Sequence, residues 1–422
     1  MSRLGALGVA LFGAALASIG AAPVSAQWLL VPMDREQSDH LRAYGLTYWV
    51  LDQGNDAEWL LNYRGGSFLL PDAPAVRREA ALRGVGIVPM DPSAEARMRA
   101  TVEASNMEAV PLERAPRVAV YTPPNSQIWD DAVTMVLEYA GIPFETIWDP
   151  EVLGEGLSEY EWIHLHHEDF TGQYSKFFLS YGGAPWLQDE VARNEEMARA
   201  AGAPNVSELK KRVADALRAY VEAGGFLFAM CSATETLELA LAAAGVDIAA
   251  QYADGDPPDP DASAKMDWDR TMAFTGAEVQ ISPSVNAFSD IDAHQVNTPW
   301  RRELGVFSLF DFSAKFDPVP AMLTQNHVSV LPDFYGLTTS FSTERLKSAA
   351  IVLASEEGAA KYLHGNLGEG TWTYFGGHDP EDPEHQIGDP PTDLTLHPNS
   401  PGYRLILNNV LFPAARKQQL KT

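Results

Sequence analysis

The sequence has 422 residues, of which 46% are hydrophobic, so most of the chain can fold around one large core or two smaller ones. Acidic residues outnumber basic residues by 57 to 30, which gives a formal net charge of −27. This balance excludes a protein that binds nucleic acid through a basic face, and it is typical of a solvated acidic surface.

The first 26 residues predict a secretory signal peptide. One basic residue, Arg3, precedes an apolar run, and Val24-Ser25-Ala26 offers small side chains for cleavage before Gln27. An uncleaved membrane anchor is the alternative, but the run is short and weakly apolar for a stable span. We therefore expect a periplasmic or secreted protein that has no membrane association after cleavage.

Residues 27–115 predict a separate, small α+β region. Short apolar runs alternate there with segments of helical spacing, and Arg64-Gly65-Gly66 marks a turn. The expected strands are 47–51, 59–63, 67–70 and 84–90, and the expected helices are 38–44, 76–83 and 93–103.

Residues 116–415 predict a second domain of the α/β class. Regular strand–helix alternation indicates a flavodoxin-like parallel sheet with helices on both faces, and ligands bind such sheets at the carboxyl ends of the strands. Residues 251–345 interrupt the alternation and are expected to form an insertion. The expected strands are 117–121, 144–148, 162–166, 226–230, 348–354, 359–366 and 370–375, and the main helices are 129–140, 206–223, 234–244 and 403–411.

The only cysteine of the chain, Cys231, directly follows a fully apolar strand and precedes a helix. Such a tight turn forces a strained backbone and exposes the side chain above the sheet. The helix N-terminus is expected to lower the pKa of the thiol, and the N–H of Ser232 could help to bind an oxyanion. An inert, buried cysteine is the alternative interpretation.

The segment from Gly224-Gly225 through the apolar strand to Cys231 resembles the nucleophile elbow of class I glutamine amidotransferase-like proteins. The run Gly376 to Glu381, which contains His378, resembles the strand-end histidine segment of that family. Residues 370–378 and the last helix also look like the ThuA-like branch. The resemblance covers residues 116–250 and 346–415. Some exported bacterial proteins of this appearance carry the label asparagine synthetase B, but the pyrophosphatase loop and N-terminal cysteine of that activity are missing from the sequence.

The resemblance implies a hydrolase that acts on an amide or a related acyl bond. Cys231 would be the nucleophile and His378 the base, oriented by Asp379 or Glu381. The sequence departs from the family pattern because alanines replace both elbow glycines and Pro380 stands where the orienting acid is expected. These departures leave open a non-catalytic, ligand-binding relative.

A run of histidines and acids at the end of the third strand of the second domain predicts a polar pocket. The residues expected to contact a small polar substrate, an amide or a sugar, are Ser232, His166, His167, Glu168 and Asp169. No cofactor is implied with certainty, but a divalent metal such as zinc fits this composition. Its expected ligands are His164, His166, His378 and His385, and a metal-dependent or metal-binding carbohydrate-processing protein is therefore the alternative function.

Overall fold

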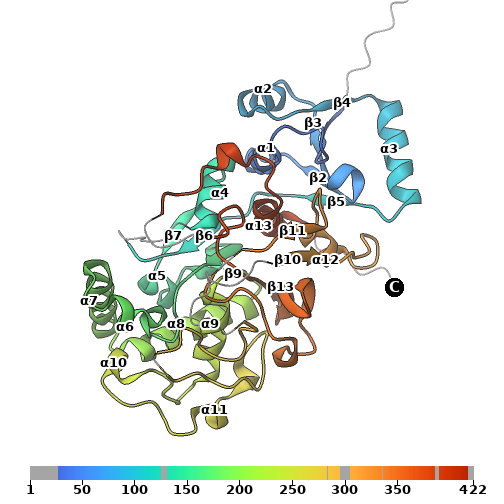
Figure 1. Ribbon diagram of the computed structural model, residues 1–422. Helices are drawn as coiled ribbons and strands as arrows, with labels where there is room; N and C mark the ends of the chain where they lie inside the picture. Colours follow the sequence, from blue (N-terminus) through green and yellow to red (C-terminus); the bar gives the residue numbers. More distant parts are fainter. Residues whose placement is uncertain are drawn as a thin grey trace, which may run out of the picture.

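The computed structural model describes residues 27–124, 131–282, 284–294, 305–334, 336–384 and 389–416. Over these ranges the chain forms two sheets with helices packed around them (Figure 1). The expected signal peptide, residues 1–26, lies outside the described residues. Among the helices that are described, none combines the length and the apolar character needed to cross a bilayer.

The N-terminal region contains a five-stranded antiparallel sheet in the order β4-β1-β3-β2-β5. Its strands are β1 (Trp28–Val31), β2 (Ala57–Leu61), β3 (Ser67–Pro71), β4 (Val88–Met90) and β5 (Glu108–Leu112). Its helices are α1 (His40–Asp52), α2 (Pro74–Arg83) and α3 (Pro92–Ala104). The strand expected at residues 47–51 is wrong, because α1 continues through them.

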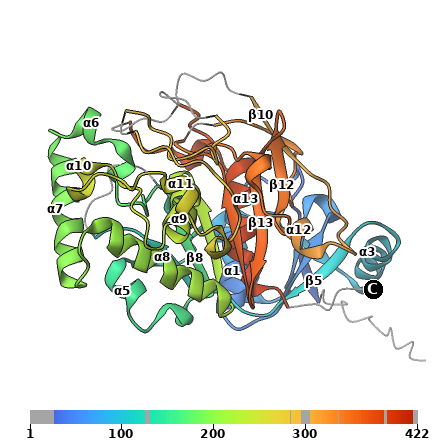
Figure 2. The same cartoon turned by 90° about the horizontal axis from the view of Figure 1, so that it is seen from below.

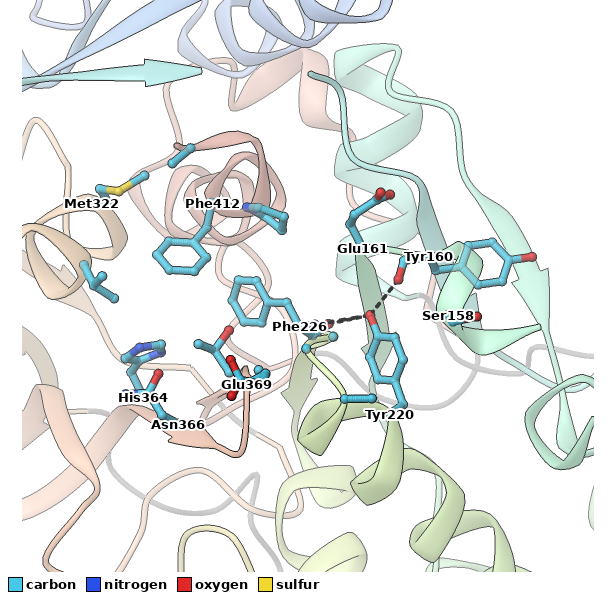
Figure 3. Close-up of a pocket in the computed structure, with 18 of the residues that line it drawn as sticks. Ser158, Tyr160, Glu161, Tyr220, Phe226, Met322, His364, Asn366, Glu369 and Phe412 are labelled. Carbon is cyan, nitrogen blue, oxygen red and sulfur yellow. Dashed lines mark hydrogen bonds between the residues drawn. The ribbon is translucent and has the colours of Figure 1, made fainter. Parts of the chain in front are cut away.

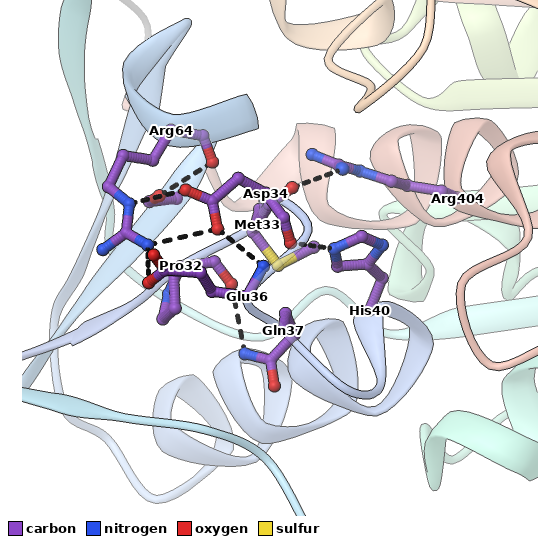
Figure 4. Close-up of polar contacts among 9 residues, drawn as sticks. Pro32, Met33, Asp34, Glu36, Gln37, His40, Arg64 and Arg404 are labelled. Carbon is purple, nitrogen blue, oxygen red and sulfur yellow. Dashed lines mark hydrogen bonds and ion pairs between the residues drawn. The ribbon is translucent and has the colours of Figure 1, made fainter.

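Helix α1 is buried on nearly all of its faces, since it packs against the second domain as well as its own sheet. The buried guanidinium of Arg404, on the last helix, secures this contact (Figure 4). It donates hydrogen bonds to the carbonyl oxygens of Met33, at 2.9 Å, and Gly65, and to the hydroxyl of Tyr44 at 3.2 Å. The N-terminal region therefore shares a core with the domain that follows it.

The second sheet has nine strands in the order β11-β10-β12-β13-β14-β9-β8-β6-β7. The strands from β14 to β7 are parallel, and in chain order they run 2-1-3-4-5 from the β7 edge, which is the flavodoxin-like order. The predicted α/β fold is thus confirmed, with an antiparallel extension to which the insertion contributes β10 and β11. The bounds are β6 (Val118–Tyr121), β7 (Glu145–Ile147), β8 (Trp162–Leu165), β9 (Phe226–Met230), β10 (Val306–Leu309), β11 (Val330–Pro332), β12 (Ile351–Glu356), β13 (Ala359–Leu367) and β14 (Gly370–Phe375).

Helices cover both faces of this sheet, because alternate residues of each central strand point to opposite sides. Phe226, Phe228 and Met230 of β9 pack on the side of α1, α4 and α13, whereas Leu227 and Ala229 pack on the side of α8 and α9 (Figure 2). The helices are α4 (Ala132–Ala140), α5 (Asp149–Leu153), α6 (Phe178–Tyr181), α7 (Pro185–Ala200), α8 (Val206–Glu222), α9 (Ser232–Ala242), α10 (Gln251–Asp254), α11 (Ala262–Lys265), α12 (Pro318–Leu323) and α13 (Pro401–Leu411).

Candidate functional site

The parallel strands β6, β8, β9 and β14 are neighbours, so the residues that follow them meet at one edge of the sheet. His166 follows β8, Cys231 follows β9, and Gly376 begins the loop after β14 that carries His378. Asp131, at the start of α4, belongs to the connection that follows β6. The fold therefore gathers imidazoles, a carboxylate and the thiol at the carboxyl edge of the sheet.

Three histidines form the histidine cluster of this edge: His166, His167 and His378. Each offers a ring nitrogen, and these nitrogens all lie within 4.8 Å of one another. The ring centroids of His166 and His378 are 4.5 Å apart, and those of His166 and His167 are 5.1 Å apart. The cluster thus draws two ligand groups from the end of β8 and one from the loop after β14, which suits a metal ion.

The carboxylate of Asp131 joins a second group of potential ligands with His164 and His166. One of its oxygens, Oδ1, lies 3.4 Å from Nε2 of His164 and 3.3 Å from Nδ1 of His166. Burial alone would raise the pKa of Asp131, but the two imidazoles hold it well below its usual range. The carboxylate is therefore charged at neutral pH and faces the ring of His166.

The hydrogen bonds of His164 fix its tautomer. Its Nδ1 lies 3.1 Å from the carbonyl oxygen of Phe228, and because a carbonyl can only accept, Nδ1 carries the proton. In the neutral ring, Nε2 then turns its lone pair toward the Asp131 carboxylate. Such a contact is stable only when a proton or a metal cation lies between the two atoms.

Burial, followed by the neighbouring His166, lowers the pKa of His167 to about 3. The ring is therefore neutral at physiological pH, which is the form that binds a metal. Of the other expected ligands, His164 belongs to the second group, with Asp131 and His166, and His385 lies outside the described residues. The sequence assigns His167 to the substrate contacts and gives no role to Asp131.

Cys231 occupies the strained turn that the sequence predicts, with φ 51° and ψ −138°. The expected exposed thiol of low pKa is wrong, however. The residue is 3% exposed, and burial raises the pKa of the thiol even though nearby backbone N–H groups counteract this effect. The N–H of Leu337, from the insertion, donates to the sulfur at 3.4 Å, so the insertion covers the elbow.

The covering segment is fixed to the elbow helix and to the loop after β14. Thr338 donates its hydroxyl to Glu235 on α9 at 2.9 Å, and its carbonyl accepts the N–H of Gly377 at 3.1 Å. A Cβ on Gly336 would lie 3.1 Å from Cα of Gly377, so a larger residue would require the backbone of the loop after β14 to shift. Access to Cys231 requires this segment to move.

The acids expected to orient His378 make contacts within their own loop. Asp379 accepts the N–H of Glu381 at 2.9 Å and the hydroxyl of Thr392 at 2.7 Å. Glu381 lies 3.0 Å from Nδ1 of His397. Asp131 contacts the histidine cluster through His166, from the other side of the site.

The remaining predicted substrate contacts surround the end of β8. Ser232 donates its hydroxyl to the carbonyl of His167 at 3.0 Å, which holds the histidine loop against α9. The Asp169 carboxylate accepts the N–H groups of Thr171, at 2.8 Å, and Ser175, at 2.9 Å. Burial, followed by Asp131, raises the pKa of Glu168 to about 8. Glu168 and Asp169 both line a small cavity beside the histidine cluster.

No family model and no curated protein matches the chain. Among solved structures, the chain is similar to a cytoplasmic protein of Salmonella typhimurium, with 11% identity, coverage of 72% of this chain and 100% of that one, and a TM-score of 0.35. A second cytoplasmic protein of Salmonella typhimurium has 10% identity, coverage of 71% and 99%, and a TM-score of 0.35. A glutamine amidotransferase of Thermotoga maritima has 11% identity, coverage of 62% and 75%, and a TM-score of 0.24. These likenesses amount to a distant similarity of fold.

Proposed function

We propose that the protein is a metal-dependent hydrolase that acts on an amide or a related acyl bond at the histidine cluster. The observation that carries this proposal is the convergence of His166, His167 and His378, whose ring nitrogens lie within 4.8 Å of one another at the carboxyl edge of the sheet. Three imidazole nitrogen ligands suit zinc, and catalytic zinc sites combine three protein ligands with a water. A bound zinc would supply a water of lowered pKa for hydrolysis.

The contact between Asp131 and His166 supports this proposal. Histidines that bind a metal through one nitrogen commonly donate the other N–H to a carboxylate, which orients the ring and increases its basicity. Nδ1 of His166 lies 3.3 Å from Asp131, and its Nε2 has no hydrogen-bond partner among the described residues. His166 is thus oriented by Asp131 and keeps a nitrogen for the metal.

Elemental analysis and zinc titration of the purified chain test the proposal. We expect zinc to bind and to raise the free energy of unfolding by about 2.7 kcal/mol when free zinc is 100 times its Kd. The His166→Gln variant should lose this stabilisation, and His397→Gln, at the partly exposed His397 outside the cluster, should keep it. A wild-type protein that is neither loaded with nor stabilised by a transition metal would contradict the proposal.

A Cys–His hydrolase is the second candidate, favoured by the strained φ of 51° at Cys231. In this case Cys231 attacks the carbonyl carbon while His378 accepts the thiol proton, the C–N bond breaks as His378 passes that proton to the departing amine, and water then hydrolyses the thioester and frees the thiol. Labelling of the native protein with a thiol reagent tests it, together with the activity of Cys231→Ser. If the thiol stays inert while the protein still hydrolyses its substrate, the Cys–His mechanism is contradicted and the metal mechanism remains. If both Cys231→Ser and His166→Gln lose hydrolysis, the reaction requires the thiol and the histidine cluster.

We also propose that the protein is exported and acts on a small polar substrate without a nucleic-acid partner. The signal-peptide pattern of residues 1–26 and the net charge of −27 support this proposal. Cell fractionation and N-terminal sequencing test it, and the expected mature protein begins at Gln27. A ThuA-like sugar-processing protein, or a relative that only binds its ligand, would be recognised by sugar binding without amide hydrolysis.

A further inference from the structure

A small cavity of about 170 Å³ opens beside the histidine cluster. It lies between the end of β8, which contributes His167 and Glu168, and helix α7, which contributes Trp186, Glu190 and Asn194. Since it shares His167 with the cluster, a molecule in this cavity lies next to the proposed metal site.

The charged groups around the cavity are mostly acidic. Glu168, Asp169, Asp189 and Glu190 line it, together with the cations of Arg193 and Lys210. Lys210 is already neutralised, because its ammonium lies 3.0 Å from both carboxylate oxygens of Asp149. One guanidinium therefore faces several carboxyl groups, and burial raises the pKa of Glu190 to about 7. A cationic guest would favour the charged form of Glu190.

Polar atoms that lack a protein partner also line the cavity. The hydroxyl of Tyr174 and Oδ1 of Asn194 belong to residues only 4% exposed, and neither atom has a hydrogen-bond partner within the described part of the chain. The amide nitrogen of Asn194 donates to the carbonyl of Glu190 at 3.0 Å, which leaves Oδ1 as an acceptor. Buried polar groups are costly to leave unsatisfied, so these atoms indicate a ligand or ordered water.

The cavity walls are rich in aromatic rings. Trp148, Tyr174, Phe177 and Trp186 all line it, and aromatic faces attract cations. The ring of Trp148 already has one such contact, because the ammonium of Lys210 lies 3.9 Å from its centroid. Two donors of the lining, Nε1 of Trp148 and Nε of Arg193, also have no partner among the described residues. Beside them the lining combines carboxyl groups, hydrogen-bond acceptors and aromatic faces, which suit a protonated amine.

We infer that this cavity binds the protonated amine of a small ligand, with Glu190 as its counter-ion and with Oδ1 of Asn194 and the hydroxyl of Tyr174 as acceptors. The inference deepens the proposed function and rests on it in one respect: if the histidine cluster hydrolyses an acyl bond, the substrate carries a basic amine next to that bond. Binding of the amine itself needs no metal.

Ethanolamine is a suitable probe, with ethylene glycol as its neutral analogue and glycolate as its anionic one. Calorimetry on the full chain at pH 7.5 should detect binding of ethanolamine, with binding of ethylene glycol weaker by about 10-fold or more and none of glycolate. The same titration with a chelator present separates the two sites. Unchanged ethanolamine binding supports the amine pocket whatever the result of zinc titration, and binding only to the zinc-loaded protein would overturn the inference.

The variants Glu190→Gln and Glu196→Gln give a matched comparison. Both remove one acid from α7, but Glu196 is exposed and does not line the cavity. We expect Glu190→Gln to weaken ethanolamine binding by about 10-fold or more and Glu196→Gln to leave it unchanged. Equal affinities in the two variants, or equal binding of ethanolamine and ethylene glycol, would overturn the amine assignment and point to a polyol pocket. Thermal unfolding of both variants verifies that they are folded.

Discussion

In the nine-stranded sheet, the amino and carboxyl ends of the parallel strands differ in the size of the adjoining cavity and in the side chains that gather there. We call these two sides of the sheet the amino edge and the carboxyl edge. At the amino ends of its parallel strands lies a cavity of about 1160 Å³, lined by apolar groups such as Phe226, Met322 and Phe412 (Figure 3). At the carboxyl ends the cavity measures only about 170 Å³, but it adjoins the histidine cluster. The larger hollow and the richer chemistry therefore lie at opposite edges.

The parallel sheet itself explains this difference. Loops that leave the carboxyl ends of neighbouring parallel strands converge, and they bring side chains from distant parts of the sequence into contact. The amino ends instead meet the ends of helices and residues of the N-terminal region, such as Val110 and Arg114, which line the larger cavity. Among the described residues, its lining holds one buried imidazole, His364, and an ion pair between Arg114 and Glu161 at 2.9 Å. Cavity size alone would place a functional site at the amino edge, away from the histidine cluster.

Replacing one histidine at each edge with glutamine, in separate variants, gives the largest expected difference, which is in zinc affinity. His378→Gln removes a proposed metal ligand and should lower the affinity for zinc by more than about 100-fold, because loss of even an outer partner costs 10–100-fold. His364→Gln should leave zinc affinity unchanged. The measurement is zinc titration against a competing chelator. Equal affinities in the two variants would place the metal elsewhere and end the distinction between the edges.

The pH dependence of stability separates His364→Gln from the wild type. Burial lowers the pKa of His364 to about 4, so between pH 6.5 and pH 4 the unfolded chain binds a proton that the folded chain does not. Stability is therefore complete above pH 6.5 and falls as the pH decreases, by roughly 3 kcal/mol for this group at pH 4. Urea unfolding at several pH values should give a shallower decrease for His364→Gln than for the wild type. An identical decrease would show that His364 is protonated in the folded state.

Asp131→Asn sharpens the assignment at the carboxyl edge. Asparagine preserves the acceptor that caps α4, where Oδ1 of Asp131 accepts the N–H of Val133 at 2.8 Å and of Thr134 at 3.0 Å. It removes the charge that faces His166, so zinc affinity should fall by about 10–100-fold with little change in the thermal midpoint. A fall in stability without a fall in zinc affinity would identify Asp131 as a helix cap alone.

The sequence suffices to predict the parallel strands of the sheet and the residues that follow two of them, Cys231 and His378. The apolar strand before Cys231 and the strand before His378 are distinct in the sequence, and their parallel pairing brings these residues to one edge. The contact of Asp131 with His166 could have been inferred, because the connection after β6 joins the same edge. Aspartate is common at the N-cap of a helix, however, so the position of Asp131 in the sequence gives no sign of a second role.

Other features depend on contacts that no local pattern contains. The insertion covers Cys231 through Leu337, 106 residues further along the chain, so the sequence around the elbow cannot indicate burial of the thiol. Helix α1 shows the same limit for secondary structure. Both sides of its segment 47–51 face apolar partners, including the domain that follows, so the helical period is lost and a strand is predicted.

The smallest expected effect comes from Tyr220→Phe at the amino edge. The Tyr220 hydroxyl lies 3.2 Å from both the carbonyl oxygen of Tyr160 and the N–H of Phe226 (Figure 3). Its removal should lower the free energy of unfolding by about 1 kcal/mol, because the N–H of Phe226 also reaches the carbonyl of Glu161 at 3.3 Å. Zinc and ethanolamine affinities should stay unchanged, since neither proposed site includes this hydroxyl. A change above about tenfold, equivalent to 1.4 kcal/mol, would mean that the two edges are energetically coupled.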